Sequence, residues 1–174
     1  MISKKEAAEG DPMKKAVAQA WKDHMTQRDK HAEDSMEGAV GPERRTLQGT
    51  RSGPTVKLEV GGVEGYITAN GFEDGHLGEV FYHGFGKEGS TLEGWTQGFA
   101  MMTSIALQYG AKLDMLARKC AHMRFEPNGE TNDPDIPWCA SVIDYTMRWL
   151  AKHYGDAKLN AELDEITRKM RKPL

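Results

Sequence analysis

The chain has 174 residues, a formal net charge of -3 and two cysteines. This length fits one domain of ordinary size with room for an arm or an extra helix. Because acidic and basic residues are interspersed, the charge excludes a general attraction to nucleic acid or to an anionic membrane. The sequence has no apolar run long enough for a signal peptide or a membrane span, so we expect a cytoplasmic protein.

Residues 1–43 are polar and carry charges of both signs. Four apolar side chains nevertheless recur at helical spacing between Met13 and Met25, after an Asp-Pro pair that is typical of a helix start. The pattern predicts a helix over about 12–32, as an arm that is helical or partly mobile. Glycines, prolines and two adjacent arginines over 38–54 indicate a linker.

The hydrophobic period changes to two at Thr55. Apolar and charged residues alternate over 55–60, a Gly-Gly pair supplies a turn, and the chain returns over 63–69. A third apolar segment over 78–85 follows a second turn. The sequence therefore predicts a small antiparallel meander of three strands.

The helical period takes over after residue 90. A long apolar stripe, which we expect to cover the meander, is formed by Leu92, Trp95, Phe99, Met102, Ala106 and Tyr109. A shorter helix follows over 113–120, then a loop over 124–137, a helix over 138–149 and a last amphipathic helix over 159–170.

Strands followed by helices predict an α+β domain, in which a three-stranded antiparallel meander is packed by several helices. The expected organisation is an N-terminal arm over 1–43, the α+β domain over 44–155 and a C-terminal amphipathic helix over 156–174.

The stretch GKEGSTLEG, residues 86–94, combines glycines, a lysine and two hydroxyl side chains. A phosphate-binding loop needs its lysine after the last glycine, whereas Lys87 precedes Gly89 and Ser90. Ser90 and Glu93 instead have the spacing of a capping box, in which each side chain bonds to the backbone amide of the other residue. A capped helix start is the favoured interpretation. An anion or nucleotide site is the alternative, with Lys87, Gly89, Ser90, Thr91 and Arg124 as its candidate residues.

Other reactive arrangements have little support. The loop 124–137 lacks the alternation of a calcium-binding loop, and we expect Arg124 to be held by neighbouring carboxylates. Cys120 and Cys139 lie on apolar stripes, where a packing role is favoured over nucleophilic or redox work. We predict no metal, no cofactor and no catalytic residue.

The run from about Arg44 to Trp149 resembles the C-terminal, non-catalytic region of adenosylcobalamin-dependent (class II) ribonucleotide reductases, the segment grouped with TSCPD domains. The strings that carry the resemblance are RR (44–45), EGYIT (64–68), EDG (73–75), GEVF (78–81), GKEGSTLEG (86–94), ALQYG (106–110), RFEPNG (124–129), NDPDI (132–136) and DYTMRWLA (144–151). The resemblance implies a TSCPD-like fold and a setting in nucleotide metabolism. The large barrel, its cysteines and a cysteine-rich tail are missing from this sequence, so it implies neither reductase activity nor cobalamin binding.

Three functional hypotheses follow. The first is a stand-alone, non-catalytic accessory or regulatory protein that binds a reductase or another enzyme of nucleotide metabolism. The second is a module that binds, and sequesters, a nucleotide or another phosphorylated ligand. The third, an enzyme with an unrecognised site, is the least supported. Because a three-stranded sheet has open edges and the terminal helices have apolar stripes, we also expect a homo-oligomer, a dimer or larger. From the charge and the lack of long apolar runs we expect neither a membrane nor a nucleic-acid partner.

Overall fold

The protein is described from a computed structural model, which describes residues 15–16, 19–20, 22–24, 26–27 and 43–170. The chain divides into two units, Met1–Pro42 and Glu43–Leu174. The described residues of the first unit are helical, and Gln19 donates a hydrogen bond to Asp23 one turn later (2.9 Å). The other residues of the helix predicted over 12–32 lie outside the described part. The second unit is an α+β domain, as predicted.

The predicted meander is confirmed. Its antiparallel strands β1 (Thr55–Val60), β2 (Val63–Gly71) and β3 (Leu77–His83) are ordered β1-β2-β3. Gly61 and Gly62 form the first turn with φ values of 57° and 79°, which only glycine adopts readily. This turn places Val60 opposite Val63 and thereby sets which residues share a face of the sheet.

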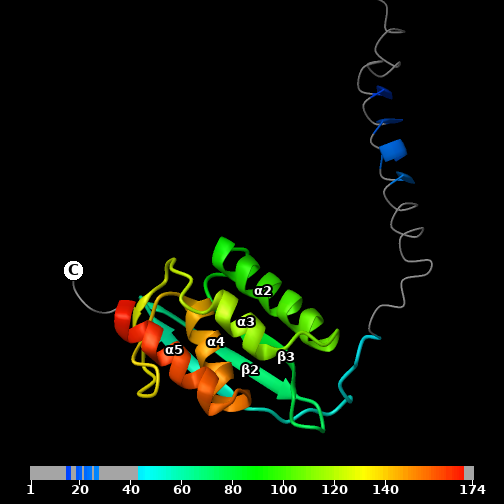
Figure 1. Cartoon of the computed structure of the whole chain (residues 1–174). Helices are drawn as coiled ribbons and strands as arrows, with labels where there is room; N and C mark the ends of the chain where they lie inside the picture. Colours follow the sequence, from blue (N-terminus) through cyan, green and yellow to red (C-terminus); the bar gives the residue numbers. More distant parts are fainter. Residues whose placement is uncertain (1–14, 17–18, 21, 25, 28–42, 171–174) are drawn as a thin grey trace, which may run out of the picture. The chain divides into compact units, whose positions relative to one another are not determined.

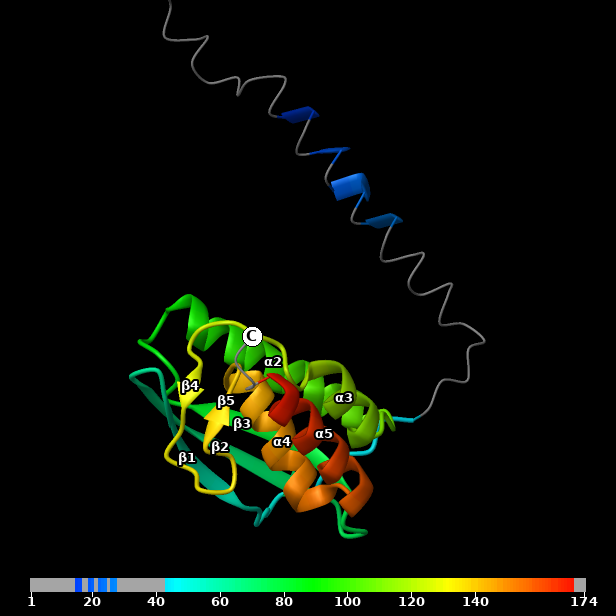
Figure 2. The ribbon, with the colours of Figure 1, turned by 60° about the vertical axis from the view of Figure 1, so that its left-hand side comes forward.

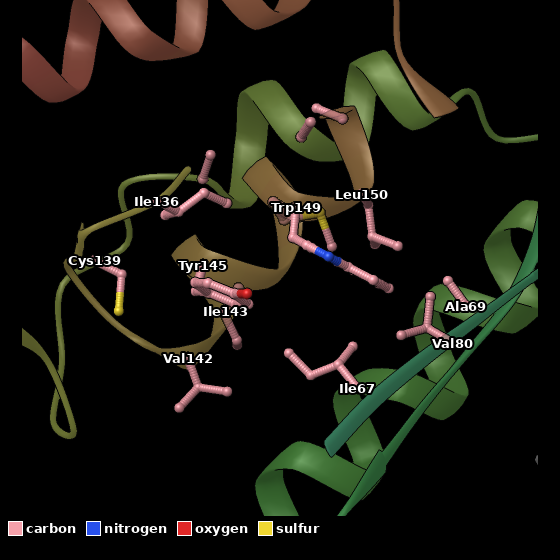
Figure 3. Packing of buried hydrophobic residues seen from close by; sticks show 14 of the residues in the cluster. Ile67, Ala69, Val80, Ile136, Cys139, Val142, Ile143, Tyr145, Trp149 and Leu150 are labelled. Carbon is pink, nitrogen blue, oxygen red and sulfur yellow. The ribbon is translucent and has the colours of Figure 1, made fainter. Parts of the chain in front are cut away.

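One face of the sheet packs against helix α4 (Val142–Tyr154). Figure 3 shows Ile67, Ala69 and Val80 of the strands pointing toward Trp149 and Leu150 of the helix. All ten residues that the structure places over 142–151 are buried, because α4 is covered on its other sides as well. The first ten residues of α4 therefore have no solvent-facing side.

Two further helices pack beside α4, namely α3 (Leu113–Cys120) and α5 (Ala157–Met170) (Figure 1). Helix α5 confirms the predicted C-terminal helix, and its Leu159 and Leu163 are fully buried. Within the described part, none of the helices has both the length and the apolar character that crossing a bilayer requires.

The helix predicted over 138–149 begins later than expected. Trp138 and Cys139 form the short strand β5 (Trp138–Cys139), which pairs with β4 (Gly129–Glu130) in a second small hairpin (Figure 2). Helix α4 starts only after Ser141, whose hydroxyl accepts a hydrogen bond from the amide of Asp144 (3.1 Å). The prediction was wrong at this end because the apolar period continues from the strand into the helix.

Helix α2 (Thr91–Gln108) covers the open edge of β3 with polar side chains. The amide Nε2 atoms of Gln97 and Gln108 donate to the carbonyls of Tyr82 (3.0 Å) and Gly78 (3.2 Å). Between them, the amide of Val80 donates to the hydroxyl of Ser104 (2.9 Å). These contacts give every second residue from Gly78 to Tyr82 at least one side-chain partner for an outward backbone group, which an unpaired edge lacks.

Helix α2 lies against the meander as expected, and Phe99 packs on the core, but the rest of its apolar stripe is not fully turned inward. Trp95 is 70% exposed and Met102 is 65% exposed. The buried positions of α2 are Thr96, Ala100, Thr103, Leu107 and Gln108. Because polar side chains must reach the edge of β3, the helix is rotated so that its largest apolar residues face outward.

The edge of β1 is covered by one amide side chain. Asn132 accepts a hydrogen bond from the amide of Glu59 (2.7 Å) through Oδ1 and donates to the carbonyl of Lys57 (3.0 Å) through Nδ2. An isolated bridge between Val60 and Thr131 continues the pairing. Both outer strands are therefore covered, and open sheet edges no longer give a reason to expect oligomers.

The edge contact of α2 predicts that Ser104→Ala destabilises the domain. The variant leaves the Val80 amide without its partner, so we expect a loss of about 1–3 kcal/mol in the free energy of unfolding, measured by urea denaturation. The matched control is Ser52→Ala, at an exposed loop serine, with an expected change within about 0.5 kcal/mol. Equal denaturation midpoints for the two variants would contradict the assigned contact.

Candidate functional site

The stretch 86–94 forms a capped helix start. The Ser90 hydroxyl accepts a hydrogen bond from the amide of Glu93 (3.2 Å), as predicted. The returning bond differs from the prediction, because the Glu93 carboxylate accepts from the amide of Gly89 (2.6 Å), while the Ser90 amide donates to the carbonyl of Lys87 (2.9 Å). The carboxylate is thus bound one residue earlier than in a standard capping box.

This arrangement places negative charge where a bound anion would need free amides. Lys87, Gly89 and Thr91 are exposed, and Ser90 is half-buried by its capping role. The anion or nucleotide site at these residues stays a prediction, and an anion there would have to bind beside the Glu93 carboxylate.

Arg124 is exposed and makes no ion pair with any residue of 43–170, so the expected pairing with neighbouring carboxylates was wrong. Four pockets in this part of the chain have volumes between 410 and 730 Å³. None of these four is lined by Lys87, Gly89, Ser90, Thr91 or Arg124. The predicted site residues therefore do not share one of these cavities.

A buried carboxylate, Asp144, organises the contacts around the start of α4, and sequence reasoning missed it. It is fully buried at the start of α4 and accepts hydrogen bonds from the amides of His122 (2.7 Å) and Ala140 (2.8 Å). The guanidinium of Arg148 lies 3.5 Å from it and donates to the carbonyl of Trp138 (2.9 Å). The Asp144 side chain thus joins the segments that follow α3 and β5 to the start of α4.

The imidazole of His122 has a structural role, because it contacts helix α5. Its backbone has φ 67°, and its Nε2 lies 3.1 Å from both the Leu163 carbonyl and the Thr167 hydroxyl of α5. Burial lowers the pKa of His122, so the neutral ring is favoured.

The two thiols are free and poorly suited to chemistry. Burial raises the pKa of Cys139 to about 12, the nearby Asp144 carboxylate adds to the shift, and burial also raises the pKa of Cys120. Because the thiolate is the nucleophile and the metal ligand, both shifts oppose reactivity. Among the described residues, His, Cys, Asp and Glu side chains form no group of three that could hold a metal ion.

The largest of the four pockets lies beside Arg45 and has a volume of about 730 Å³. The guanidinium of Arg45 lies 3.9 Å from the centre of the Phe72 ring and 2.8 Å from the Asp74 carboxylate. A hydrogen bond from the His76 amide, followed by the pairing with Arg45, lowers the pKa of Asp74 to about 2. Apolar walls from Phe72, Leu107 and Tyr154, with a charged rim, match the general character of small-molecule pockets.

A second exposed feature is the face of the sheet opposite α4. Tyr66 of β2 is 47% exposed and Phe81 of β3 is 42% exposed. The exposed His83 lies opposite Tyr66 in the strand register, and its ring stacks with that of Phe81 at 6.3 Å between centroids. Neighbouring Lys57, Glu59 and Glu64 are joined by ion pairs of 2.7 and 2.9 Å. We call this aromatic and charged surface the outer sheet face.

Comparison with known proteins decides the family. The model of the TSCPD domain matches residues 42–154. The chain belongs to the TSCPD domain family. This match covers the sheet, α2, α3, the β4–β5 hairpin and α4.

Several curated relatives are vitamin B12-dependent ribonucleotide reductases. Those of Streptomyces avermitilis and Streptomyces coelicolor are 46% identical over 110 residues, 63% of this chain and 11% of each relative. The reductase of Streptomyces clavuligerus is 38% identical over 148 residues, 82% of this chain and 15% of that protein. The chain thus matches less than a fifth of the length of these relatives. No solved structure matches it.

The strings that carry the resemblance bond to one another in the TSCPD domain. Arg44 and Arg45 bond to Gln108 and Asp74 (both 2.8 Å), which joins RR to ALQYG and EDG. The Tyr145 hydroxyl donates to the Asp133 carboxylate (2.7 Å) and so joins DYTMRWLA to NDPDI. Five of the strings therefore contact one another within the fold.

The Asp144 network predicts a large stability effect. Asp144→Ala leaves two buried amides without acceptors and Arg148 without its nearest carboxylate, so we expect a loss of about 3–5 kcal/mol in the free energy of unfolding. Asp144→Asn retains an acceptor and should have an intermediate effect. The matched control Asp114→Ala removes only an exposed ion pair and should cost less than about 1 kcal/mol, by urea denaturation. A similar effect of all three variants would count against this role.

The pKa of Cys139 predicts its labelling. At pH 8 a thiol with a pKa near 12 is roughly one part in ten thousand thiolate, and the side chain is fully buried. Iodoacetamide followed by mass spectrometry should modify the half-buried Cys120 slowly in the native protein, and Cys139 only after unfolding. Rapid native labelling of Cys139 would show an accessible, activated thiol.

Proposed function

We propose that this TSCPD domain protein is a non-catalytic accessory or regulatory protein in nucleotide metabolism that acts through a protein partner. The proposed partner is a vitamin B12-dependent ribonucleotide reductase or another enzyme of nucleotide metabolism. The carrying observation is that the match to the reductases covers the TSCPD domain, in which strings that carry the resemblance bond to one another. The burial of both thiols and the structural use of His122 favour the same conclusion.

The outer sheet face is the surface that we propose for this partner. Interfaces of non-obligate complexes are about as polar as the rest of a protein surface but are enriched in aromatic residues. Tyr66 and Phe81 supply the aromatic centre, and the ion pairs of Lys57 supply a polar rim. Of the strands beneath, β2 is paired on both sides, and side chains bond to the outer edges of β1 and β3.

The test is binding of the tagged full chain to the purified vitamin B12-dependent ribonucleotide reductase of Streptomyces coelicolor, by biolayer interferometry. Phe81→Ala should weaken binding by about thirtyfold, because an aromatic at an interface centre contributes roughly 2 kcal/mol or more. The control is Phe125→Ala, since Phe125 is 36% exposed in the loop before β4 and is not a residue of the outer sheet face.

Two different negative results would test the proposed surface and the proposed function separately. Equal binding of Phe81→Ala and Phe125→Ala would place the contact elsewhere. Failure of the wild-type chain to bind this reductase, or any nucleotide-metabolism enzyme captured from lysate, would contradict the accessory function itself.

Binding of a nucleotide or another phosphorylated ligand is the second candidate function, favoured by the pocket beside Arg45. Arg45, His76 and Lys112 lie around its apolar wall, although Asp74, Asp114 and Asp156 line it too. Thermal shift with a panel of ribo- and deoxyribonucleotides tests this function. Lys112→Ala would abolish stabilisation by a ligand in this pocket, whereas Lys87→Ala would abolish it for a ligand at the helix start of α2.

A further inference from the structure

The outward face of α2 is an apolar surface that residues 43–170 leave uncovered. Its most exposed members are Trp95 (70%), Met102 (65%), Met101 (63%) and Tyr109 (46%). In a helix of 3.6 residues per turn these side chains lie on the side opposite the buried Ala100 and Leu107. Single exposed apolar residues are ordinary on protein surfaces, but a contiguous group along one helix indicates an interaction surface.

This face carries no charge. From Gly94 to Ala111 the sequence contains no Asp, Glu, Lys, Arg or His. Most exposed helices of soluble proteins place charged residues on their outer side, and charged residues are depleted at the core of stable interfaces. Two copies of a neutral face can meet without repulsion between like charges.

Two glycines lie at the centre of the same face. A Cβ added to Gly94 or Gly98 would meet no described atom within 4 Å, so packing inside the domain gives no reason for glycine at either position. Glycine destabilises the interior of a helix relative to alanine. It also lets a second backbone approach closely, which gives these positions a role only when another segment lies across α2.

We propose that α2 is the dimer interface of this protein, with α2 of a second copy packed antiparallel across Gly98. The two Gly98 residues then lie opposite each other. A residue a given number of positions after Gly98 in one chain faces the residue the same number of positions before Gly98 in the other. Met102 is then level with Gly94, and Met101 with Trp95. A large side chain lies beside a glycine at two symmetry-related places, so the face is complementary to itself, as a two-fold interface requires.

The exposed apolar area of α2 is compatible with a dimer interface. A large side chain exposes about 200 Å² when free, so Trp95, Met101, Met102 and Tyr109 together expose roughly 500 Å² per chain. Two copies would bury at most about 1,000 Å² from these side chains, which reaches the lower bound for a specific interface. The inference does not depend on the proposed function, because the outer sheet face is a separate surface.

The first test is sedimentation velocity of the full chain over a wide range of concentrations. The wild-type protein should sediment with twice the chain mass of 19.4 kDa. Met102→Glu should raise the dimer dissociation constant by at least about a hundredfold, because it buries a charge without a partner. The matched control is Met115→Glu on α3, where the methionine is 51% exposed, and it should leave the dimer unchanged.

The second test fixes the register. Gly98→Cys would bring two cysteines together at the two-fold axis, within the distance that a disulfide spans, so mild oxidation should link two chains. Met115→Cys and the wild-type chain, which retains Cys120 and Cys139, measure the background.

Three results would overturn the proposal. One is a wild-type chain that stays monomeric at every concentration. Another is a Met102→Glu variant that dimerises as well as the wild type. The third is linkage of Gly98→Cys no faster than that of Met115→Cys.

Discussion

The fold depends on how the three-stranded sheet closes its two edges. Neither outer strand gains a further full strand within residues 43–170, yet side chains bond to outward backbone groups on both. Asn132 does this for β1 with one amide side chain, and α2 does it for β3 with Gln97, Ser104 and Gln108. Since unpaired backbone groups at a sheet edge invite aggregation, these polar contacts replace additional strands.

The edge contact determines the surface of the protein. A helix that covers a strand edge with polar side chains must turn those residues inward, so the rotation of α2 is set by hydrogen bonding. Trp95 and Met102 consequently face outward, and the neutral α2 surface follows from the same constraint that completes the sheet. The buried carboxylate of Asp144 in turn holds the backbone at His122 and Ala140 against the start of α4. Polar contacts therefore determine how the elements are oriented, and apolar side chains pack in the space between them.

The sequence predicted features that depend on local chemistry. The Gly61-Gly62 turn, the alternation of β1 and β2 and the cap at Ser90 each act within a few residues, and each was found. The rotation of α2 could not be predicted, because periodicity assumes that the apolar stripe of a helix faces the core. The hairpin of β4 and β5 was missed since each strand has two residues.

The role of Asp144 has the same explanation. In sequence it is an ordinary acidic residue in the first turn of a helix, and its partners His122 and Ala140 lie in the loops before that helix. The candidate residues Lys87 and Arg124 were chosen by charge and neighbouring glycines, and such a pattern cannot reveal that Glu93 already bonds to the Gly89 amide. Contacts between distant segments are the part that one sequence leaves open.

Hydrogen exchange at the Val80 amide, followed by NMR, tests the central claim most directly. In the structure this outward-facing amide donates to the Ser104 hydroxyl, so the account predicts exchange as slow as that of amides within the β2–β3 ladder. Exchange as fast as in an exposed loop would contradict it, because α2 would then not be bonded to the edge of β3 and its rotation would need another explanation.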